Sequence, residues 1–149
     1  MCHARDIWAW LLYCKTEVHI MKIGTYFDDY EFACKCGRHG CDSDGHPILD
    51  HVIDKRLVDV LDAIRERIGQ PIEVLSGYRC PEHNAEVGGV SNSQHVLGTA
   101  ADITYDGIDV DYLAQVAEEC GADGIGKYYH QDFVHVDVRG YAARWNDLD

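Results

Sequence analysis

Two short segments of the chain carry side chains that can bind a metal ion. Residues 93–102 (SQHVLGTAAD) contain His95 and Asp102, and residues 132–137 (DFVHVD) contain His135. Hydrolytic zinc sites usually have three His, Asp or Glu ligands, which leaves a fourth position for water or substrate. The two imidazoles and the carboxylate therefore form a candidate ligand set for a catalytic divalent cation.

Neighbouring strands are needed to bring these ligands together. Residues 99–104 (TAADIT) and 133–138 (FVHVDV) have the short, apolar and β-branched character of strands. A period of two places His135 and Asp137 on one face of the sheet and the adjacent valines on the other. Gly98 allows the chain to turn just before the first of these strands.

The remaining segments predict an α+β fold. The clearest helix is expected over residues 53–68, where apolar side chains recur every three or four positions, with Asp50 as its N-cap and Gly69 at its end. Further helices are expected at residues 81–87 and 109–120, and further strands at residues 71–76 and 124–129. This order is typical of a small, mainly antiparallel sheet with flanking helices.

The composition restricts the kinds of partner. The chain has 149 residues, of which 46% are hydrophobic, so it can form one domain with a packed core. Its formal net charge of −13 argues against a nucleic-acid binder and against adsorption to an anionic membrane, since both partners are negatively charged. The apolar run at residues 7–13 is far shorter than the roughly 20 residues that span a bilayer. We expect a monomer.

Residues 1–20 differ in character from the rest of the chain. They contain two tryptophans and two cysteines without clear periodicity, and Met21 then opens a segment typical of a domain start. We expect residues 1–20 to be an N-terminal extension outside the catalytic fold, and residues 21–149 to form a single domain. The alternative is an N-terminal helix packed on that domain.

The two ligand-bearing segments together resemble a known family. The pattern S-x-H-x-x-G-x-A-x-D followed by D-x-x-H-x-D resembles the zinc D-Ala-D-Ala peptidases. This group also includes phage L-alanyl-D-glutamate endopeptidases, vancomycin-resistance dipeptidases and the hedgehog signalling domain. The match extends upstream through residues 76–84 (SGYRCPEHN) and Gly88-Gly89, and covers roughly residues 30–140. It implies the hedgehog/DD-peptidase-like fold.

The resemblance implies a role for each residue that matches a family motif. In that family the histidine and aspartate of the first motif and the last histidine bind zinc, which assigns His95, Asp102 and His135 as ligands. An acidic residue three positions before the last histidine is the general base, and Asp132 occupies that position. Arg79 matches the family arginine that contacts substrate, where a guanidinium can hold a carboxylate or stabilise an oxyanion.

Three further polar residues are expected to support the site. Ser93 is expected to orient the ligand loop or to contact the peptide. His130, two residues before the predicted base, is a candidate to stabilise the oxyanion, as a similarly placed histidine does in some relatives. Asp137 is expected to orient His135 rather than to bind the metal itself.

The resemblance implies a zinc metallopeptidase that hydrolyses a peptide bond in peptidoglycan stem peptides, as a D-Ala-D-Ala carboxypeptidase or an L-Ala-D-Glu endopeptidase. Because no secretion signal is recognisable, we expect a cytoplasmic product of phage or prophage type that acts on the cell wall after release. The alternative is a non-catalytic, zinc-containing binding module of the same fold. A non-haem iron oxygenase is disfavoured, because no histidine follows His135.

The chain also contains a cysteine cluster. Seven cysteines are many for this length, and an odd number cannot all pair within one chain. Cys34, Cys36 and Cys41, with His39 among them and Cys80 elsewhere, are candidates to hold a second, structural zinc ion. Their spacing is not that of a standard CxxC pair, so reduced thiols or a single disulfide are the alternative.

Overall fold

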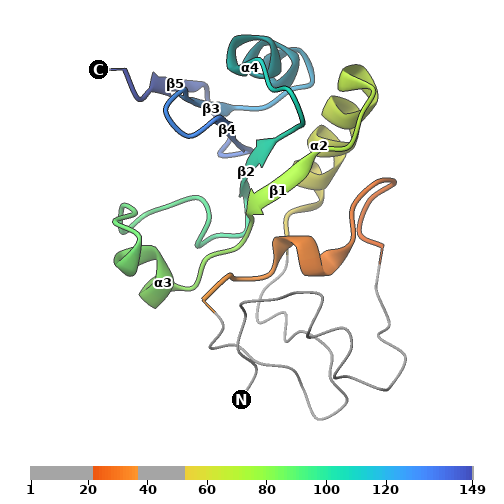
Figure 1. Cartoon of the computed structure of the whole chain (residues 1–149). Coiled ribbons are helices and arrows are strands. Elements are labelled where there is room, and N and C mark those ends of the chain that lie inside the picture. The colour runs from red at the N-terminus through yellow and green to blue at the C-terminus, as the bar shows by residue number, and fades with distance from the viewer. Residues whose placement is uncertain (1–21, 37–52, 149) are drawn as a thin grey trace.

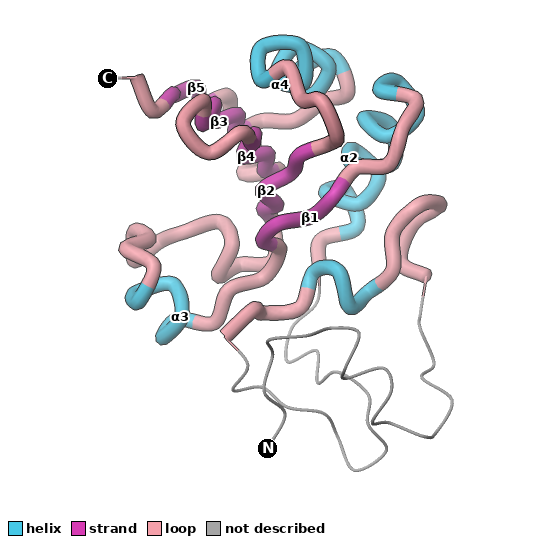
Figure 2. The backbone as a smooth tube through the Cα atoms, in the orientation of Figure 1, coloured by secondary structure: helices cyan, strands magenta, loops and turns pink. Residues whose placement is uncertain are grey.

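The computed structural model describes residues 22–36 and 53–148, whose strands form one sheet (Figure 1, Figure 2). The strand order is β1-β2-β4-β3-β5. The strands are β1 (Glu73–Ser76), β2 (Ala100–Thr104), β3 (Gly124–Tyr128), β4 (Phe133–Asp137) and β5 (Ala143–Asn146). The described helices are the 3₁₀ turn η1 (Asp29–Phe32), α2 (Lys55–Ile68), α3 (Pro81–Glu86) and α4 (Val110–Glu119). The α+β class predicted from the sequence is confirmed.

The sheet is mainly antiparallel, as predicted, with one parallel strand at its edge. Strand β2 pairs with β1 and β4, and β4 pairs with β3, all antiparallel, whereas β5 runs parallel to β3. Strand β5 is missing from the sequence prediction, because none of its four residues is fully buried and it has no apolar face to reveal a period of two.

The register of the sheet separates the core from the candidate site. Asp102 on β2 lies directly opposite His135 on β4. Val134 and Val136 point to the other face of β4, where both are buried in the hydrophobic core. The predicted alternation along this strand is therefore confirmed, and it leaves one face of the sheet for packing and one for polar side chains.

The two longer helices pack on the core face of the sheet. Helix α4 contacts β3 and β4, and helix α2 contacts α4. Both helices bury an apolar stripe with helical spacing. The buried apolar residues are Leu57, Val58, Val60, Leu61 and Ile64 from α2, and Val110, Leu113, Ala114, Val116 and Ala117 from α4.

Helix α2 begins at a different cap from the one predicted. Its N-cap is Asp54, whose side chain accepts a hydrogen bond from the backbone N–H of Arg56 at 2.8 Å. Asp50, the predicted cap, lies outside the described residues. The helix ends as predicted at Gly69, where a φ of 77° favours glycine.

The segment around η1 packs closely against the loop that follows β1. Phe27 and Phe32 are buried and meet edge to face, with ring centroids 5.9 Å apart. The backbone N–H of Tyr78 donates to the Phe32 carbonyl at 2.8 Å. A side chain at position 77 would come within 2.6 Å of the Phe32 Cα atom, so Gly77 is required for this approach.

Some sequence predictions concern residues that the structure does not describe. The predicted N-terminal extension, residues 1–20, and the predicted metal ligand Cys41 both lie outside the described ranges. Within those ranges, no helix has the combination of length and apolar character that crossing a bilayer requires.

Replacing Leu61 by alanine tests the assignment of the core. Leu61 has no exposed surface, so Leu61→Ala removes buried contacts and leaves a cavity. We expect the free energy of unfolding, measured in urea, to fall by about 2–5 kcal/mol. Leu148→Ala is the control, because Leu148 is 62% exposed. Equal effects of the two changes would contradict the described core.

Candidate metal centre

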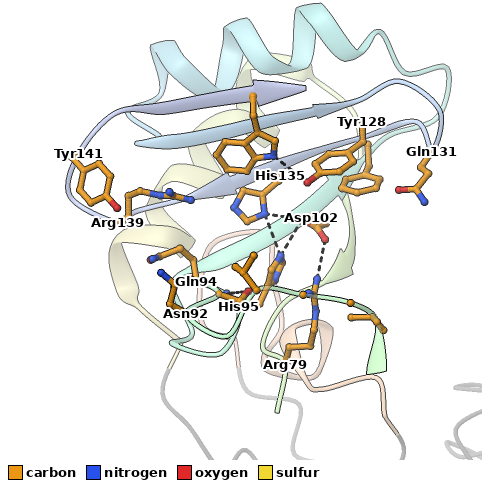
Figure 3. A pocket seen from close by; sticks show the side chains of 17 residues that line it. Arg79, Asn92, Gln94, His95, Asp102, Tyr128, Gln131, His135, Arg139 and Tyr141 are labelled. Atoms are coloured by element: carbon orange, nitrogen blue, oxygen red, sulfur yellow. Dashed lines mark hydrogen bonds and ion pairs between the residues drawn. The ribbon is translucent and has the colours of Figure 1, made fainter. Parts of the chain in front are cut away.

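Three electron-donating atoms meet on the polar face of the sheet. His95 Nε2 lies 3.1 Å from Asp102 Oδ1 and 3.2 Å from His135 Nδ1, and His135 Nδ1 lies 3.0 Å from Asp102 Oδ1. Figure 3 shows the three side chains pointing toward one another. All three residues are buried. The structure therefore brings the predicted ligand set together as an almost equilateral triangle of donor atoms.

His95 reaches the triangle from a loop whose shape is set locally. Its backbone N–H donates to the Ser93 hydroxyl at 3.3 Å, and its ring Nδ1 donates to the Gly77 carbonyl at 2.7 Å. Because that carbonyl can only accept, the bond assigns the ring proton to Nδ1 and leaves a lone pair on Nε2. Gly98, with a φ of 74°, provides the predicted turn into β2.

His135 is oriented by a buried carboxylate on the same face of β4. Its Nε2 lies 2.8 Å from Asp137 Oδ2. Asp137 has no exposed surface, and both of its oxygens are contacted by the Arg139 guanidinium, at 2.9 Å from Nε to Oδ1 and 2.5 Å from Nη2 to Oδ2. The backbone N–H of Gly124 also donates to Oδ1 at 3.1 Å. The oxygens of Asp137 are therefore already used by Arg139, Gly124 and His135. The role of Asp137 is to orient His135 rather than to bind a metal ion.

The donor set fits a divalent cation. Each imidazole uses one nitrogen for a partner outside the triangle, Gly77 O for His95 and Asp137 for His135. The remaining nitrogens and the Asp102 oxygen are acceptors that face one another in a buried space. Without positive charge between them this arrangement is unfavourable. Ligands at 2.0–2.1 Å from a tetrahedral zinc ion would be about 3.4 Å apart, close to the observed spacing.

The pKa values in the triangle show the same preference for positive charge. Burial alone would raise the pKa of Asp102, but hydrogen bonds with His135 and His95 outweigh it and hold the pKa well below its usual range. Burial would likewise lower the pKa of His135, and its bonds to Asp102 and Asp137 reverse that effect and raise it. The site favours a proton, or a divalent cation in place of that proton.

Arg79 lies beside the triangle, as the sequence predicts. One of its terminal nitrogens is 3.4 Å from Asp102 Oδ2, and the guanidinium also contacts Ser76 Oγ and Asn84 Oδ1. These contacts are long, between 3.3 and 3.4 Å, so the guanidinium is positioned without being fully engaged. It is available to an anionic group entering the site.

The triangle and Arg79 line a cavity of about 550 Å³. Ser93 lines it too, in addition to fixing the His95 loop. One wall is aromatic: the Trp145 ring lies 5.1 Å from the His135 ring between centroids, and its Nε1 donates to the Tyr128 hydroxyl at 3.0 Å. Tyr128 in turn stacks on Phe133 at 4.4 Å. A cavity with one apolar wall and a few polar groups is typical of a small-ligand or peptide site.

Two residues that were predicted to act directly in the reaction do not line the cavity. Asp132 is exposed in the turn between β3 and β4, where its carbonyl accepts a hydrogen bond from Thr104 at 2.8 Å. Its φ is 53°, and no other described non-glycine residue has a positive φ. His130 is also exposed, and its backbone N–H donates to Asp147 at 3.0 Å. The catalytic roles predicted for these two residues stay predictions.

The sequence patterns do not reveal every residue that lines the cavity or supports its lining. Arg139 follows Asp137 by two positions, so extending the period of two along β4 would have found it. Asn84, which contacts Arg79, is buried in α3 and carried no signal of its own. Trp145 comes from β5, the strand that the sequence does not reveal. Gly126 makes room for it, since a side chain there would come within 2.4 Å of the indole.

Comparison with known proteins identifies the family. A family model described as peptidase M15 matches residues 25–137, which include every residue of the triangle. The chain belongs to the peptidase M15 family. This confirms the family that the sequence motifs indicated, and the hedgehog/DD-peptidase-like fold accompanies it.

The relatives are named as peptidoglycan L,D-endopeptidases and as a zinc D-Ala-D-Ala carboxypeptidase. The chain is 33% identical to peptidoglycan L,D-endopeptidase MepK of Escherichia coli K12 over 100 residues, which is 62% of this chain and 54% of that protein. It is 40% identical to the zinc D-Ala-D-Ala carboxypeptidase of Streptomyces albus G over 80 residues, 51% of this chain and 31% of that one. A probable MepK of Haemophilus influenzae is 32% identical over 106 residues, 66% and 56% of the two chains. The chain thus spans about half the length of the MepK proteins and less of the carboxypeptidase.

Replacing Arg139 by alanine tests the support of His135 in this M15 domain. The change leaves the buried Asp137 carboxylate without its cationic partner, so we expect the free energy of unfolding to fall by about 3 kcal/mol. Arg67→Ala is the matched control, because Arg67 pairs with Glu119 at the surface and exposed pairs contribute at most about 1 kcal/mol. Urea denaturation of both variants measures the difference. Similar losses in the free energy of unfolding would show that the buried Asp137–Arg139 pair contributes no more than an exposed pair.

Proposed function

We propose that this chain is a zinc-dependent peptidase that hydrolyses a peptide bond in peptidoglycan stem peptides. The observation that carries the proposal is the buried triangle of His95, Asp102 and His135, whose remaining ring nitrogens already have partners elsewhere. The names of the M15 relatives support both the metal and the substrate class. Either carboxypeptidase or endopeptidase action is compatible with the cavity.

The triangle would hold the zinc ion, with Asp137 and Gly77 O fixing the two imidazoles. When bound, zinc supplies a Lewis acid that can polarise a peptide carbonyl and lower the pKa of water. The cavity has room for a short peptide segment beside this position, with the aromatic wall of Tyr128, Phe133 and Trp145 along one side. Such a wall would limit the access of bulk water and so strengthen the electrostatic interactions within the site.

Arg79 would bind the negative charge of the substrate. Its guanidinium lines the cavity next to Asp102 and is also held by Ser76 and Asn84. A planar guanidinium can pair with a terminal carboxylate through two parallel hydrogen bonds, or stabilise an oxyanion through one. Both tasks occur in hydrolysis of a short peptide.

Asp132 would act as the general base and later return the proton to the leaving amine. The turn that carries it joins the strands of His135 and Tyr128, and its left-handed backbone is a conformation that aspartate tolerates better than most residues. Backbone conformations of this kind are enriched at functional sites. Its place outside the cavity lining, however, is the observation that favours the alternative, a non-catalytic binding module of the same fold.

The metal requirement is tested by chelation and by removal of one ligand. We expect purified peptidoglycan and short D-Ala-terminated peptides to be cleaved, as read by mass spectrometry, and cleavage to stop with a chelator and return on addition of zinc. His95→Ala should reduce cleavage below detection and lower the bound zinc, because two ligands remain. Cleavage that survives both treatments would rule out a zinc mechanism at this triangle.

The role of Asp132 is tested by Asp132→Asn, because asparagine also tolerates the left-handed conformation while it cannot take up the proton. We expect kcat to fall by about 10²–10⁴-fold with zinc content unchanged. Asp106→Asn, which removes another exposed carboxylate, is the control and should leave kcat within about twofold of the wild-type value. Full activity of Asp132→Asn would assign the base elsewhere. Zinc binding by the unaltered chain without any cleavage would support the binding module.

A further inference from the structure

A second cluster of metal-binding atoms lies apart from the triangle. The sulfur atoms of Cys34, Cys36 and Cys80 all lie within 4.8 Å of one another. Two of these cysteines come from the segment that follows η1, and the third comes from the start of α3, more than 40 residues further along the chain. Three thiols converging from two distant segments form an arrangement that the peptidase site does not use.

The spacing of the sulfur atoms is that of metal ligands rather than of a disulfide. Cys36 Sγ and Cys80 Sγ are 3.9 Å apart, nearly twice the roughly 2.05 Å of an S–S bond. Two thiolates on a tetrahedral zinc ion, each about 2.3 Å from the metal, are about 3.8 Å apart. The observed distance matches the edge of such a tetrahedron.

Backbone N–H groups are directed at the sulfur atoms. The N–H of Cys80 donates to Cys34 Sγ at 3.3 Å, and the N–H of His83 donates to Cys80 Sγ at 3.3 Å. Such bonds stabilise negative charge on sulfur and are the usual surroundings of a metal-bound thiolate.

The cluster lies where a cross-link would order the substrate-binding arginine. Three consecutive N–H groups of one loop have partners in different segments: Tyr78 donates to Phe32 O, Arg79 to His95 O at 3.2 Å, and Cys80 to Cys34 Sγ. Arg79 therefore sits between the candidate ligand loop and the cysteine cluster. A metal ion at the cluster would fix the loop on the side away from the cavity.

We propose that Cys34, Cys36 and Cys80 provide three ligands of a second, structural zinc site that ties the segment after η1 to the Arg79 loop. Thiolate ligands select zinc over the harder divalent cations magnesium and calcium. The sequence analysis named Cys34, Cys36 and Cys41, with Cys80 elsewhere in the chain. Within the described residues the cluster consists of Cys34, Cys36 and Cys80, and Cys41 lies outside those residues. The site is independent of the peptidase triangle and would persist without it.

Metal stoichiometry of the full chain tests the proposal. Elemental analysis of the reduced protein should give two zinc ions per chain, and one for Cys80→Ser or Cys34→Ser. His95→Ala should also give one, with the remaining ion at the thiolates, so that a failure of the peptidase site and a failure of this site are distinguished. The matched control is Cys120→Ser, a partly buried thiol at the end of α4, which should retain two.

Cobalt substitution gives a second readout that needs no cysteine variant. A cobalt-loaded His95→Ala chain should show the near-ultraviolet charge-transfer absorption of thiolate ligation. The proposal is overturned if this absorption is absent. It is also overturned if Cys80→Ser, while still folded, binds as much zinc as the unaltered chain. Peptide mapping without reductant that joins Cys80 to Cys34 or Cys36 through a disulfide would overturn it as well.

Discussion

The candidate site depends on one physical constraint: three acceptor atoms of buried residues are held against one another. His95 and His135 can face the Asp102 carboxylate with lone pairs only because Gly77 O and Asp137 occupy their other nitrogens. Burying such a group of acceptors costs free energy that positive charge must offset. The packing around the triangle, from Arg139 on one side to the loop at Gly77 on the other, keeps that unfavourable geometry in place.

The elements that position the triangle were largely predictable. The period of two in 133–138 placed His135 and Asp137 on one face, and the helical repeat of 53–68 located α2. Both patterns work because one face of each element packs in the apolar core, which fixes the spacing of apolar side chains. The N-cap of α2 was less predictable. Position 50 and position 54 are both aspartate, a residue that favours N-caps, and residue type alone does not select between them.

The rest of the site could not be derived from local patterns. Strand β5 pairs through its backbone and buries no apolar face, so Trp145 gave no sign that it covers His135. The approach of Cys80 to Cys34 depends on the packing of Phe32 against Gly77, a tertiary contact invisible in residue spacing. The ligands themselves were assigned through a family resemblance, because nine histidines offer too many combinations for chemistry alone to select two.

The parallel pairing of β5 with β3 separates the aromatic wall of the cavity from the elements that carry the candidate metal ligands. His95, Asp102 and His135 come from β2, β4 and the loop before β2, and β2 and β4 pair with strands other than β5. The aromatic wall, by contrast, requires Trp145, the third residue of β5, to reach Gly126. Loss of the β5 pairing would therefore open one side of the cavity to solvent and leave the three polar side chains in place on β2, on β4 and in the loop before β2.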